Sequence, residues 1–369
     1  GLRVRNLTTG EDRWLAYPVT HDDQESRATR DLLPGYSFTP DGSAILTTSG
    51  GKIERIEIAD GKRSVIPFTA KVSLDIGPDL IQQEKDPEGP VVARMAQTPS
   101  LSPSGDTVLF SALGELYSMA LQDDATPRKI ERAGTNVFQP SWSKHGRYIT
   151  YINWTPEGGN IWRMRANGRG SPERVSQNTG YYSDPHFTPD GSEIVAVRTS
   201  NHQFNMADPS AQRDLIAIDV ETGAARVIMS GTNFGSTHFG NAANRVYLYS
   251  GTGALFSIRL DGTDRREHLN VTGKGLYFAA RPVPARDMRL SPDGRYALAR
   301  SQEQLQLVTV PKTGGDTVTV NVAGPSVPLN TLSDFGVDYF SWSDDGETML
   351  WSVGSTIYTQ KLSDVEWVK

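Results

Sequence analysis

A short segment recurs along the 369-residue chain and constrains its fold more than any other feature. The fullest copies have an aromatic residue or leucine, then Ser or Thr, Pro, Asp and Gly, and then a short apolar run. Clear copies are YSFTPDGSAIL (36–46), PHFTPDGSEIV (185–195) and MRLSPDGRYAL (288–298). Four others begin at residues 99, 140, 237 and 340, and the copy at 237 has lost the Pro and Gly of its turn. Seven copies, mostly 41 to 52 residues apart, indicate one repetitive architecture.

The order Ser/Thr, Pro, Asp, Gly is typical of a type I β-turn. The first residue supplies a side-chain acceptor, Pro presets φ, and Gly closes the turn. In PHFTPDGSEIV, His186, Thr188 and Asp190 lie within five positions, which is also compatible with a catalytic cluster or a metal site. Thr188 and Asp190 have counterparts in most copies, and seven equivalent active sites in one chain are implausible. We therefore interpret the stretch as a turn.

The residues that follow each turn predict β-strands. An apolar strand such as EIVAV comes first, then an alternating strand such as LIAIDV, and often a second tight turn and a fourth strand. Four short antiparallel strands, repeated seven times, predict an all-β fold. The expected architecture is a seven-bladed β-propeller of four-stranded antiparallel blades, formed by residues 33–362 as a single domain.

The two ends of the chain bear on how such a ring closes. The last copy (338–362) supplies three strands, and EDRWLAY (11–17) reads as a fourth strand that would cover its edge. The preceding LRVRNL reads as a third strand, which the last blade already has. We expect residues 1–17 to form a strand or hairpin that either closes the ring or is left from an upstream blade.

Composition excludes several classes of function. The chain has no cysteine, which removes disulfides, thiolate nucleophiles and cysteine-ligated metal sites. No apolar run approaches the roughly 18 residues that span a bilayer. The formal charge of −6 is spread along the chain without a basic stripe. Neither a membrane span nor a nucleic-acid partner is therefore expected.

The repeat, with its aromatic–Ser–Pro–Asp–Gly core, resembles the TolB-like β-propeller repeat over almost the whole chain. Stretches such as LRVRNLTTGEDRWLAYPV and YFSWSDDGETMLWSVGSTIY also resemble the propeller region of large bacterial exported amidohydrolases. That resemblance implies a non-catalytic module that docks, gates or binds ligand for an attached or partner metal-dependent amidohydrolase, in the periplasm or outside the cell. No His-x-His motif follows the final TQKLSDVEWVK, so no cofactor is expected in this chain, and a divalent metal would belong to the hydrolase domain.

The longest insertions all fall on one face of the predicted ring. They include the polar, Pro-bounded stretch 77–90 between blades and the loop 199–214 between a second and a third strand. Long loops on a rigid scaffold are frequent binding sites, although tolerated insertion is the simpler alternative. We expect a peptide or carbohydrate ligand at this face, and 77–90 is a candidate docking loop.

Six residues are candidates for binding ligand. His186 and His238 share one repeat position near the channel, Arg289 holds that position in the next copy, and Asp184 and Asp287 each lie two residues before it. His202 lies in the long loop 199–214. Imidazoles and carboxylates at a channel mouth suit a divalent cation or an acidic sugar, but ordinary channel polarity is an alternative. No residue is assigned as catalytic or as a metal ligand. A self-sufficient enzyme of the polysaccharide lyase type and a protein-binding scaffold remain alternative functions.

Overall fold

The computed structural model describes residues 1–20, 35–74, 77, 88–122, 124–199, 211–275, 281–314 and 316–367. They form two compact units, Gly1–Pro90 and Val91–Lys369, each of which is described here by itself. The regular structure of the described residues is β, apart from two short 3-10 turns, η2 (Glu131–Ala133) and η3 (Leu362–Asp364). No helix of the described residues is long and apolar enough to cross a membrane.

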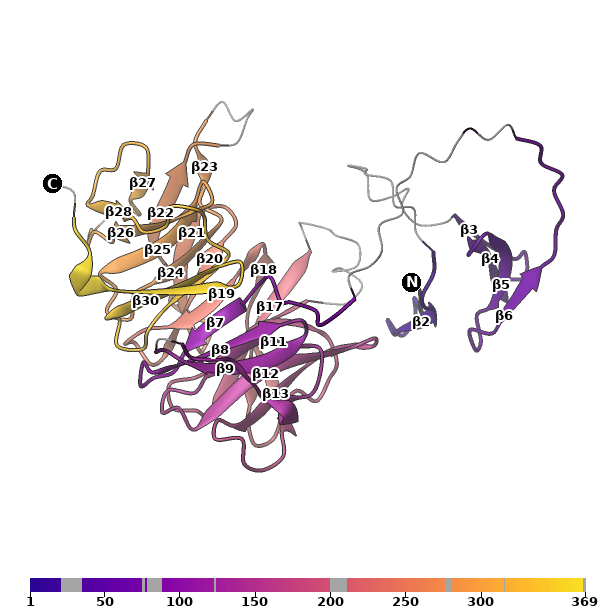
Figure 1. Cartoon of the computed structure of the whole chain (residues 1–369), viewed down its shortest axis with the longest axis horizontal. Helices are drawn as coiled ribbons and strands as arrows, with labels where there is room; N and C mark the ends of the chain where they lie inside the picture. Colours follow the sequence, from indigo (N-terminus) through magenta and orange to yellow (C-terminus); the bar gives the residue numbers. More distant parts are fainter. Residues whose placement is uncertain are drawn as a thin grey trace. The chain divides into compact units, whose positions relative to one another are not determined.

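The unit Val91–Lys369 contains six sheets, whose strands are antiparallel except that β27 pairs parallel to β22 (Figure 1). The strands of the first three are β7 (Gln97–Leu101), β8 (Thr107–Ala112), β9 (Glu115–Ala120) and β10 (Arg128–Lys129); β11 (Val137–Trp142), β12 (Tyr148–Thr155), β13 (Gly158–Arg165) and β14 (Glu173–Arg174); and β15 (Tyr181–Phe187), β16 (Glu193–Thr199), β17 (Gln212–Asp219) and β18 (Ala225–Thr232). Those of the other three are β19 (Phe234–Phe239), β20 (Arg245–Ser250), β21 (Ala254–Arg259) and β22 (Arg266–Gly273), extended by β23 (Val283–Pro284) and β27 (Thr319–Asn321); β24 (Asp287–Leu290), β25 (Tyr296–Ser301), β26 (Gln304–Thr309) and β28 (Leu329–Thr331); and β29 (Tyr339–Trp342), β30 (Thr348–Val353) and β31 (Thr356–Lys361).

Burial follows from the apolar runs of the middle strands. Strands β16 and β25 read EIVAVRT and YALARS, and their central residues are buried on both faces. A sheet that is apolar on both faces needs a neighbour on each side. Six apolar clusters of buried residues supply this contact, one between each pair of adjacent sheets. Six sheets, four of them four-stranded, therefore stand side by side around a central channel, which confirms the predicted propeller architecture.

The Pro-Asp-Gly segments are turns, and the interpretation of PHFTPDGSEIV is confirmed. Thr188 Oγ1 donates to Asp190 Oδ1 at 2.6 Å and accepts the backbone N–H of Glu193 at 3.1 Å. Hydrogen bonds from Thr188 and Ser192 lower the pKa of Asp190. The same hydroxyl–carboxylate pair recurs in other copies, for example between Ser291 and Asp293 at 2.7 Å. These side chains close the hairpin, as the turn interpretation predicts.

The ring of Val91–Lys369 closes between its first and last sheets. The backbone N–H of Ala96 donates to the carbonyl of Gly354 at 2.8 Å. Leu350 of β30 and Ile357 of β31 pack into the apolar cluster of β7 and β8. The predicted number of seven blades is thus not confirmed, because six sheets already complete this ring and the first repeat folds in the other unit.

The unit Gly1–Pro90 contains a hairpin and a four-stranded sheet. The hairpin is β1 (Leu2–Arg5) and β2 (Asp12–Ala16); the sheet is β3 (Tyr36–Phe38), β4 (Ala44–Ser49), β5 (Lys52–Glu57) and β6 (Arg63–Ile66). Leu2 and Leu15 of the hairpin pack against Ile45 and Ile56 of the sheet. The expected strand within 11–17 is therefore present, but it pairs with β1, and no described strand covers the outer edge of β31. Its role in closing a ring stays a prediction.

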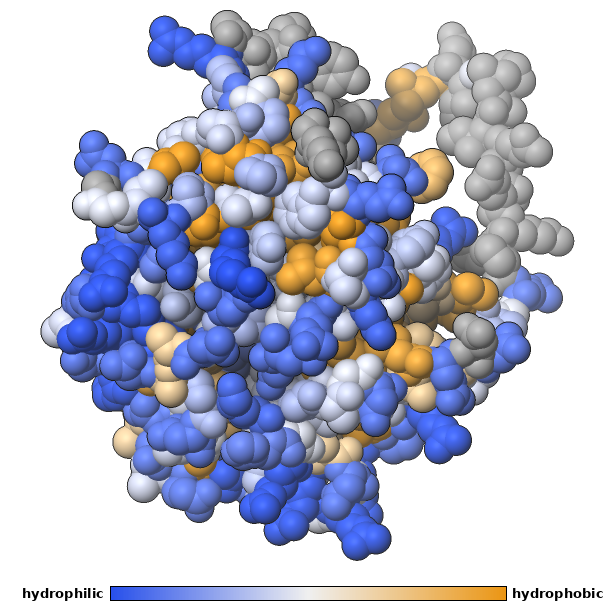
Figure 2. All heavy atoms as spheres, turned by 90° about the vertical axis from the view of Figure 1, so that its left-hand side faces the viewer, coloured by the Kyte–Doolittle hydropathy of each residue, from blue (hydrophilic) through white to orange (hydrophobic). Residues whose placement is uncertain are grey.

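Figure 2 shows one face of the molecule, on which hydrophilic side chains predominate and apolar ones lie in separate small areas between them.

Candidate functional site

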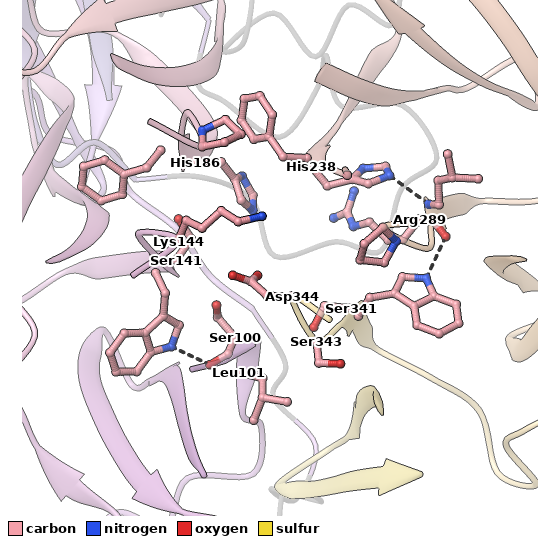
Figure 3. A pocket seen from close by; sticks show the side chains of 18 residues that line it. Ser100, Leu101, Ser141, Lys144, His186, His238, Arg289, Ser341, Ser343 and Asp344 are labelled. Atoms are coloured by element: carbon pink, nitrogen blue, oxygen red, sulfur yellow. Dashed lines mark hydrogen bonds between the residues drawn. The ribbon is translucent and has the colours of Figure 1, made fainter. Parts of the chain in front are cut away.

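One residue from each inner strand occupies the same repeat position at the channel. These six residues are Ser100, Ser141, His186, His238, Arg289 and Ser341. They line a single cavity of about 140 Å³, in which the imidazoles and the guanidinium come from three consecutive blades and the serines from the other three (Figure 3). The fold thus brings three of the predicted ligand-binding residues together, although whether they bind a ligand is still a prediction.

Two charged residues at the rim of this cavity were missed by sequence reasoning. Lys144 and Asp344 each lie two places after the tryptophan of their copy, Trp142 or Trp342. Other copies have a proline at this position, such as Pro189 and Pro292. Burial raises the pKa of Asp344, and the ammonium of Lys144 acts in the opposite direction. A charged residue in place of the turn proline is the signal that would have identified them.

The cavity lies at the end of the channel that carries the tight turns. Its lining includes turn residues such as Pro189, Gly240 and Pro292 together with the late residues of the inner strands. The first residues of the inner strands lie at the other end, which the sequence favoured for ligand binding. The loops 77–90 and 199–214 expected at that end fall largely outside the described residues.

His238 acts as a bridge between two blades. Its Nδ1 lies 2.9 Å from the carbonyl oxygen of Ser236, and its Nε2 accepts the backbone N–H of Leu290 on β24 at 2.9 Å (Figure 3). Burial, followed by the nearby guanidinium of Arg289, lowers the pKa of His238 to about 3. The ring is neutral at pH 7, with Nδ1–H as donor and Nε2 as acceptor. Both nitrogens are engaged in the scaffold, so His238 is poorly placed to bind a metal or a ligand proton.

His186 has a different environment. Its Nδ1 lies 3.2 Å from both the carbonyl oxygen of Asp184 and the hydroxyl of Thr237, while Nε2 makes no hydrogen bond to a described residue. Burial lowers the pKa of His186, against the opposing effect of Asp184. In Figure 3 the imidazole and the side chain of Lys144 point toward the same space. A neutral imidazole with one free nitrogen can accept a hydrogen bond or a proton from a ligand.

Arg289 is the principal fixed cation of the cavity. Its Nη2 lies 3.8 Å from Asp287 Oδ2, a loose ion pair, and its carbonyl accepts the indole N–H of Trp342 at 3.2 Å. Nη1 is buried and has no hydrogen-bond partner among the described residues. Burial raises the pKa of Asp287, and Arg289 opposes this shift. The guanidinium therefore keeps donor capacity that its own carboxylate does not use.

Asp184 has a structural partner on each side. It lies at a β-bulge in β15 with φ of +52°, and equivalent bulged residues with positive φ are Thr98 in β7, Gln139 in β11 and Ser236 in β19. Gln139 Oε1 accepts the backbone N–H of Asp184 at 2.9 Å, and Asp184 Oδ2 accepts that of Ser236 at 3.0 Å. Ser236 in turn hydrogen-bonds Asp287. This chain of contacts links four consecutive blades around the channel.

The six predicted residues therefore separate into groups. His186 and Arg289 offer free hydrogen-bonding atoms, whereas Asp184 and His238 hold blades together, and Asp287 pairs with Arg289. His202 lies outside the described residues. Within the described part of the chain, no group of three or more His, Asp or Glu side chains is arranged to hold a metal ion.

The comparisons with known proteins agree with this architecture. No family model matches the chain. In sequence, 115 residues (28% of this chain) are 26% identical to the Tol-Pal system protein TolB of Francisella tularensis subsp. holarctica, and the match spans 26% of that protein. In structure, a protein assigned as TolB from Agrobacterium tumefaciens has a TM-score of 0.51 at 16% identity, over 73% of this chain and 91% of the other.

Hydrazine synthase of Kuenenia stuttgartiensis has a TM-score of 0.50 at 14% identity, over 92% of this chain and 99% of the other. At such identities the likeness concerns the fold and not the activity. The fold is a β-propeller. One segment of it is also TolB-like in sequence, whereas a link to amidohydrolases is not among these findings.

Proposed function

We propose that the chain is a non-catalytic β-propeller module that binds an acidic ligand in its channel and serves an attached or partner metal-dependent amidohydrolase. The observation that carries the binding role is the buried, unpartnered Nη1 of Arg289 beside the free Nε2 of His186. A buried donor without an acceptor is costly, and a carboxylate oxygen is the strongest acceptor for a guanidinium. Lys144 lies on the same cavity, but the carboxyl of Asp344 lies there too, so Arg289 carries the charge argument.

The hydrolase part rests on the resemblance of the N- and C-terminal stretches to the propeller region of exported amidohydrolases. The same resemblance places the module in the periplasm or outside the cell. The similarity to a Tol-Pal system protein is compatible with such a location and with a role in protein–protein contact.

The binding role is tested by calorimetric titration of the full chain with trigalacturonate, an acidic trisaccharide. Arg289→Gln should weaken binding by about tenfold or more, because a charge-assisted hydrogen bond is lost. Arg289→Lys, which keeps the charge, controls for folding. Arg295→Gln is the matched control, since Arg295 lies on the same blade but pairs with Asp293 at an exposed turn. If all three variants bind trigalacturonate with the affinity of the wild type, the channel is ruled out as the acidic-ligand site.

The hydrolase role is tested on the native polypeptide. Chemical cross-linking and mass spectrometry in the source cells should identify a metal-dependent amidohydrolase, either in the same polypeptide or linked to 77–90 or another segment of the long-loop face. Recovery of the propeller without any hydrolase contradicts the hydrolase role. The acidic-ligand role is then decided by the calorimetric titration alone.

A second candidate is a polysaccharide lyase, favoured by the neutral His186 with its free Nε2 beside Arg289. In such a reaction the base takes the proton next to the uronate carboxylate, the bond to the leaving sugar oxygen breaks, and a carbon–carbon double bond forms. The unsaturated product absorbs in the ultraviolet. Product formation from polygalacturonate that is abolished by His186→Ala would establish the lyase; no absorbance change would exclude it for this substrate.

A further inference from the structure

A second cavity lies at the opposite mouth of the channel, where the inner strands begin. Its volume is about 470 Å³, and it is formed by the first residues of the inner strands β7, β11, β15 and β29 together with the end of β12. Five of its nine lining residues are aromatic: Phe138, Trp154, Tyr181, Tyr182 and Tyr339. We call these five residues and their cavity the aromatic cleft.

The aromatic cleft is held in shape by the backbone. The ring centroids of Trp154 and Tyr181 are 4.7 Å apart, with the planes tilted by 60°. The backbone N–H of Trp154 donates to the backbone carbonyl oxygen of Asn136 at 2.9 Å. Gly159 and Gly180 exchange two hydrogen bonds beside the indole, and a Cβ on Gly159 would lie 3.2 Å from Trp154 Cε2. The glycine therefore lets the strand pack closely against the indole, so the aromatic wall exists before any ligand arrives.

The polar groups of the cleft are neutral. Among its lining residues none is charged, and the polar side chains are two glutamines, a serine and a threonine besides the tyrosines. Gln139 uses its oxygen to accept the N–H of Asp184, which leaves its amide NH₂ as a donor. Gln97 hydrogen-bonds Tyr339. A ligand that fits must present an apolar face to the rings and neutral hydroxyl or amide groups to the glutamines.

We propose that the aromatic cleft is a binding site for a neutral oligosaccharide. A pyranose ring has an apolar C–H face that can lie on an aromatic ring, and its edge carries hydroxyls that both donate and accept. Pockets of this size, mainly apolar with a few placed polar groups, are typical ligand sites. The absence of charged groups among the lining residues disfavours an acidic sugar, which distinguishes this site from the cationic cavity at the other end.

The two sites are separate along one channel. A third cavity between them shares Gln139 and Tyr339 with the aromatic cleft and His186 and Arg289 with the cationic cavity. The chain of bulged residues lies at this middle level. The oligosaccharide site therefore goes beyond the proposed function and does not depend on it.

The test is calorimetric titration of the full chain with maltotriose, cellotriose and N,N′,N″-triacetylchitotriose, and with trigalacturonate and the peptide Gly-Trp-Gly for comparison. At least one neutral trisaccharide should bind with a Kd below about 1 mM. Trp154→Leu and Tyr181→Leu should each weaken it by about tenfold, since each removes a stacking surface. Arg289→Gln should leave it unchanged, which separates this site from the acidic-ligand site.

Two variants guard against a mere loss of fold. Trp154→Phe keeps an aromatic ring and should retain most of the affinity, and Phe335→Leu replaces a surface aromatic that is 89% exposed and is not part of the cleft. The proposal is overturned if no neutral trisaccharide binds, if Trp154→Leu and Tyr181→Leu bind as the wild type does, or if Gly-Trp-Gly or trigalacturonate is preferred at this site.

Discussion

Asp184 Oδ2 accepts the backbone N–H of Ser236 at 3.0 Å, and both residues have a positive φ at a β-bulge of their inner strands. The Asp184 carboxylate of one blade thus accepts a hydrogen bond from the Ser236 N–H of the next blade. The β-bulge leaves this N–H without a partner in its own sheet. Because a bulged residue is unpaired in its own sheet, such contacts determine how adjacent blades are held at the channel.

Asp184→Ala should destabilise the protein by about 2 kcal/mol, because the N–H of Ser236 loses its acceptor and alanine tolerates a positive φ poorly. Asp184→Asn is the matched control, since asparagine keeps an acceptor oxygen and accepts this conformation. Its loss should be about 1 kcal/mol or less. Equilibrium unfolding in urea measures both values, and similar losses for the two variants would contradict the structural role of the acceptor.

The turns and strands could be predicted from the sequence because they depend on local signals. Thr188, Pro189, Asp190 and Gly191 define a hairpin turn whatever lies around them. The number of blades could not be predicted in this way, because nothing local to the first repeat shows whether its sheet joins the ring of Val91–Lys369.

The candidate site was predicted only in part, for a similar reason. Repeat alignment placed His186, His238 and Arg289 at one level of the channel, which the structure shows. It could not show that both ring nitrogens of His238 are hydrogen-bonded to the backbone, since one of the two partners, Leu290, lies 52 positions away on the next blade. A proline after the bulged residue, as in Thr98-Pro99, Gln139-Pro140 and Asp184-Pro185, would have indicated three of the bulges, but the bulge at Ser236 lacks this signal.

Acid should weaken the fold through its buried histidines. The pKa of His238 is about 3 in the folded protein, against an ordinary value of 6.5. Between these values the unfolded chain binds the proton and the folded chain does not, so the free energy of unfolding falls as pH decreases below about 6.5, by up to about 1.4 kcal/mol per pH unit. The pKa of His186 and of His268 is also lowered, so they act in the same direction.

His238→Gln should make this dependence shallower. Urea unfolding between pH 7.5 and 4.5, compared for the wild type and the variant, measures the change in slope. The buried carboxyls of Asp287 and Asp344, whose pKa is raised, are present in both proteins. The exposed turn residue His145 supplies the control, His145→Gln, which should keep the wild-type slope. A variant at position 238 with an unchanged slope would show that this histidine is not buried and neutral in solution.

Thr188→Val should cost about 1–3 kcal/mol, because the buried hydroxyl joins Asp190 to the backbone N–H of Glu193. The same change should raise the pKa of Asp190 toward its ordinary value, since the Thr188 hydroxyl is the main cause of its lowering. Thr188→Ser keeps the hydroxyl and should keep the low pKa. Carboxylate titration by NMR distinguishes the two variants even where their stabilities are alike.

The six-sheet ring makes a prediction about the isolated segment Val91–Lys369. The N–H of Ala96 reaches the carbonyl of Gly354, and Leu350 packs among buried residues of β7 and β8, so the first and last sheets already cover each other. The segment should therefore fold cooperatively, with a Tm within about 5 °C of the full chain. Removal of β29 to β31 from it is the control, because that deletion exposes two apolar sheet faces and should abolish the cooperative transition. If Val91–Lys369 instead melts without cooperativity while the full chain does not, the sheet β3 to β6 is needed inside the ring, and the seven-bladed arrangement expected from the repeats is correct.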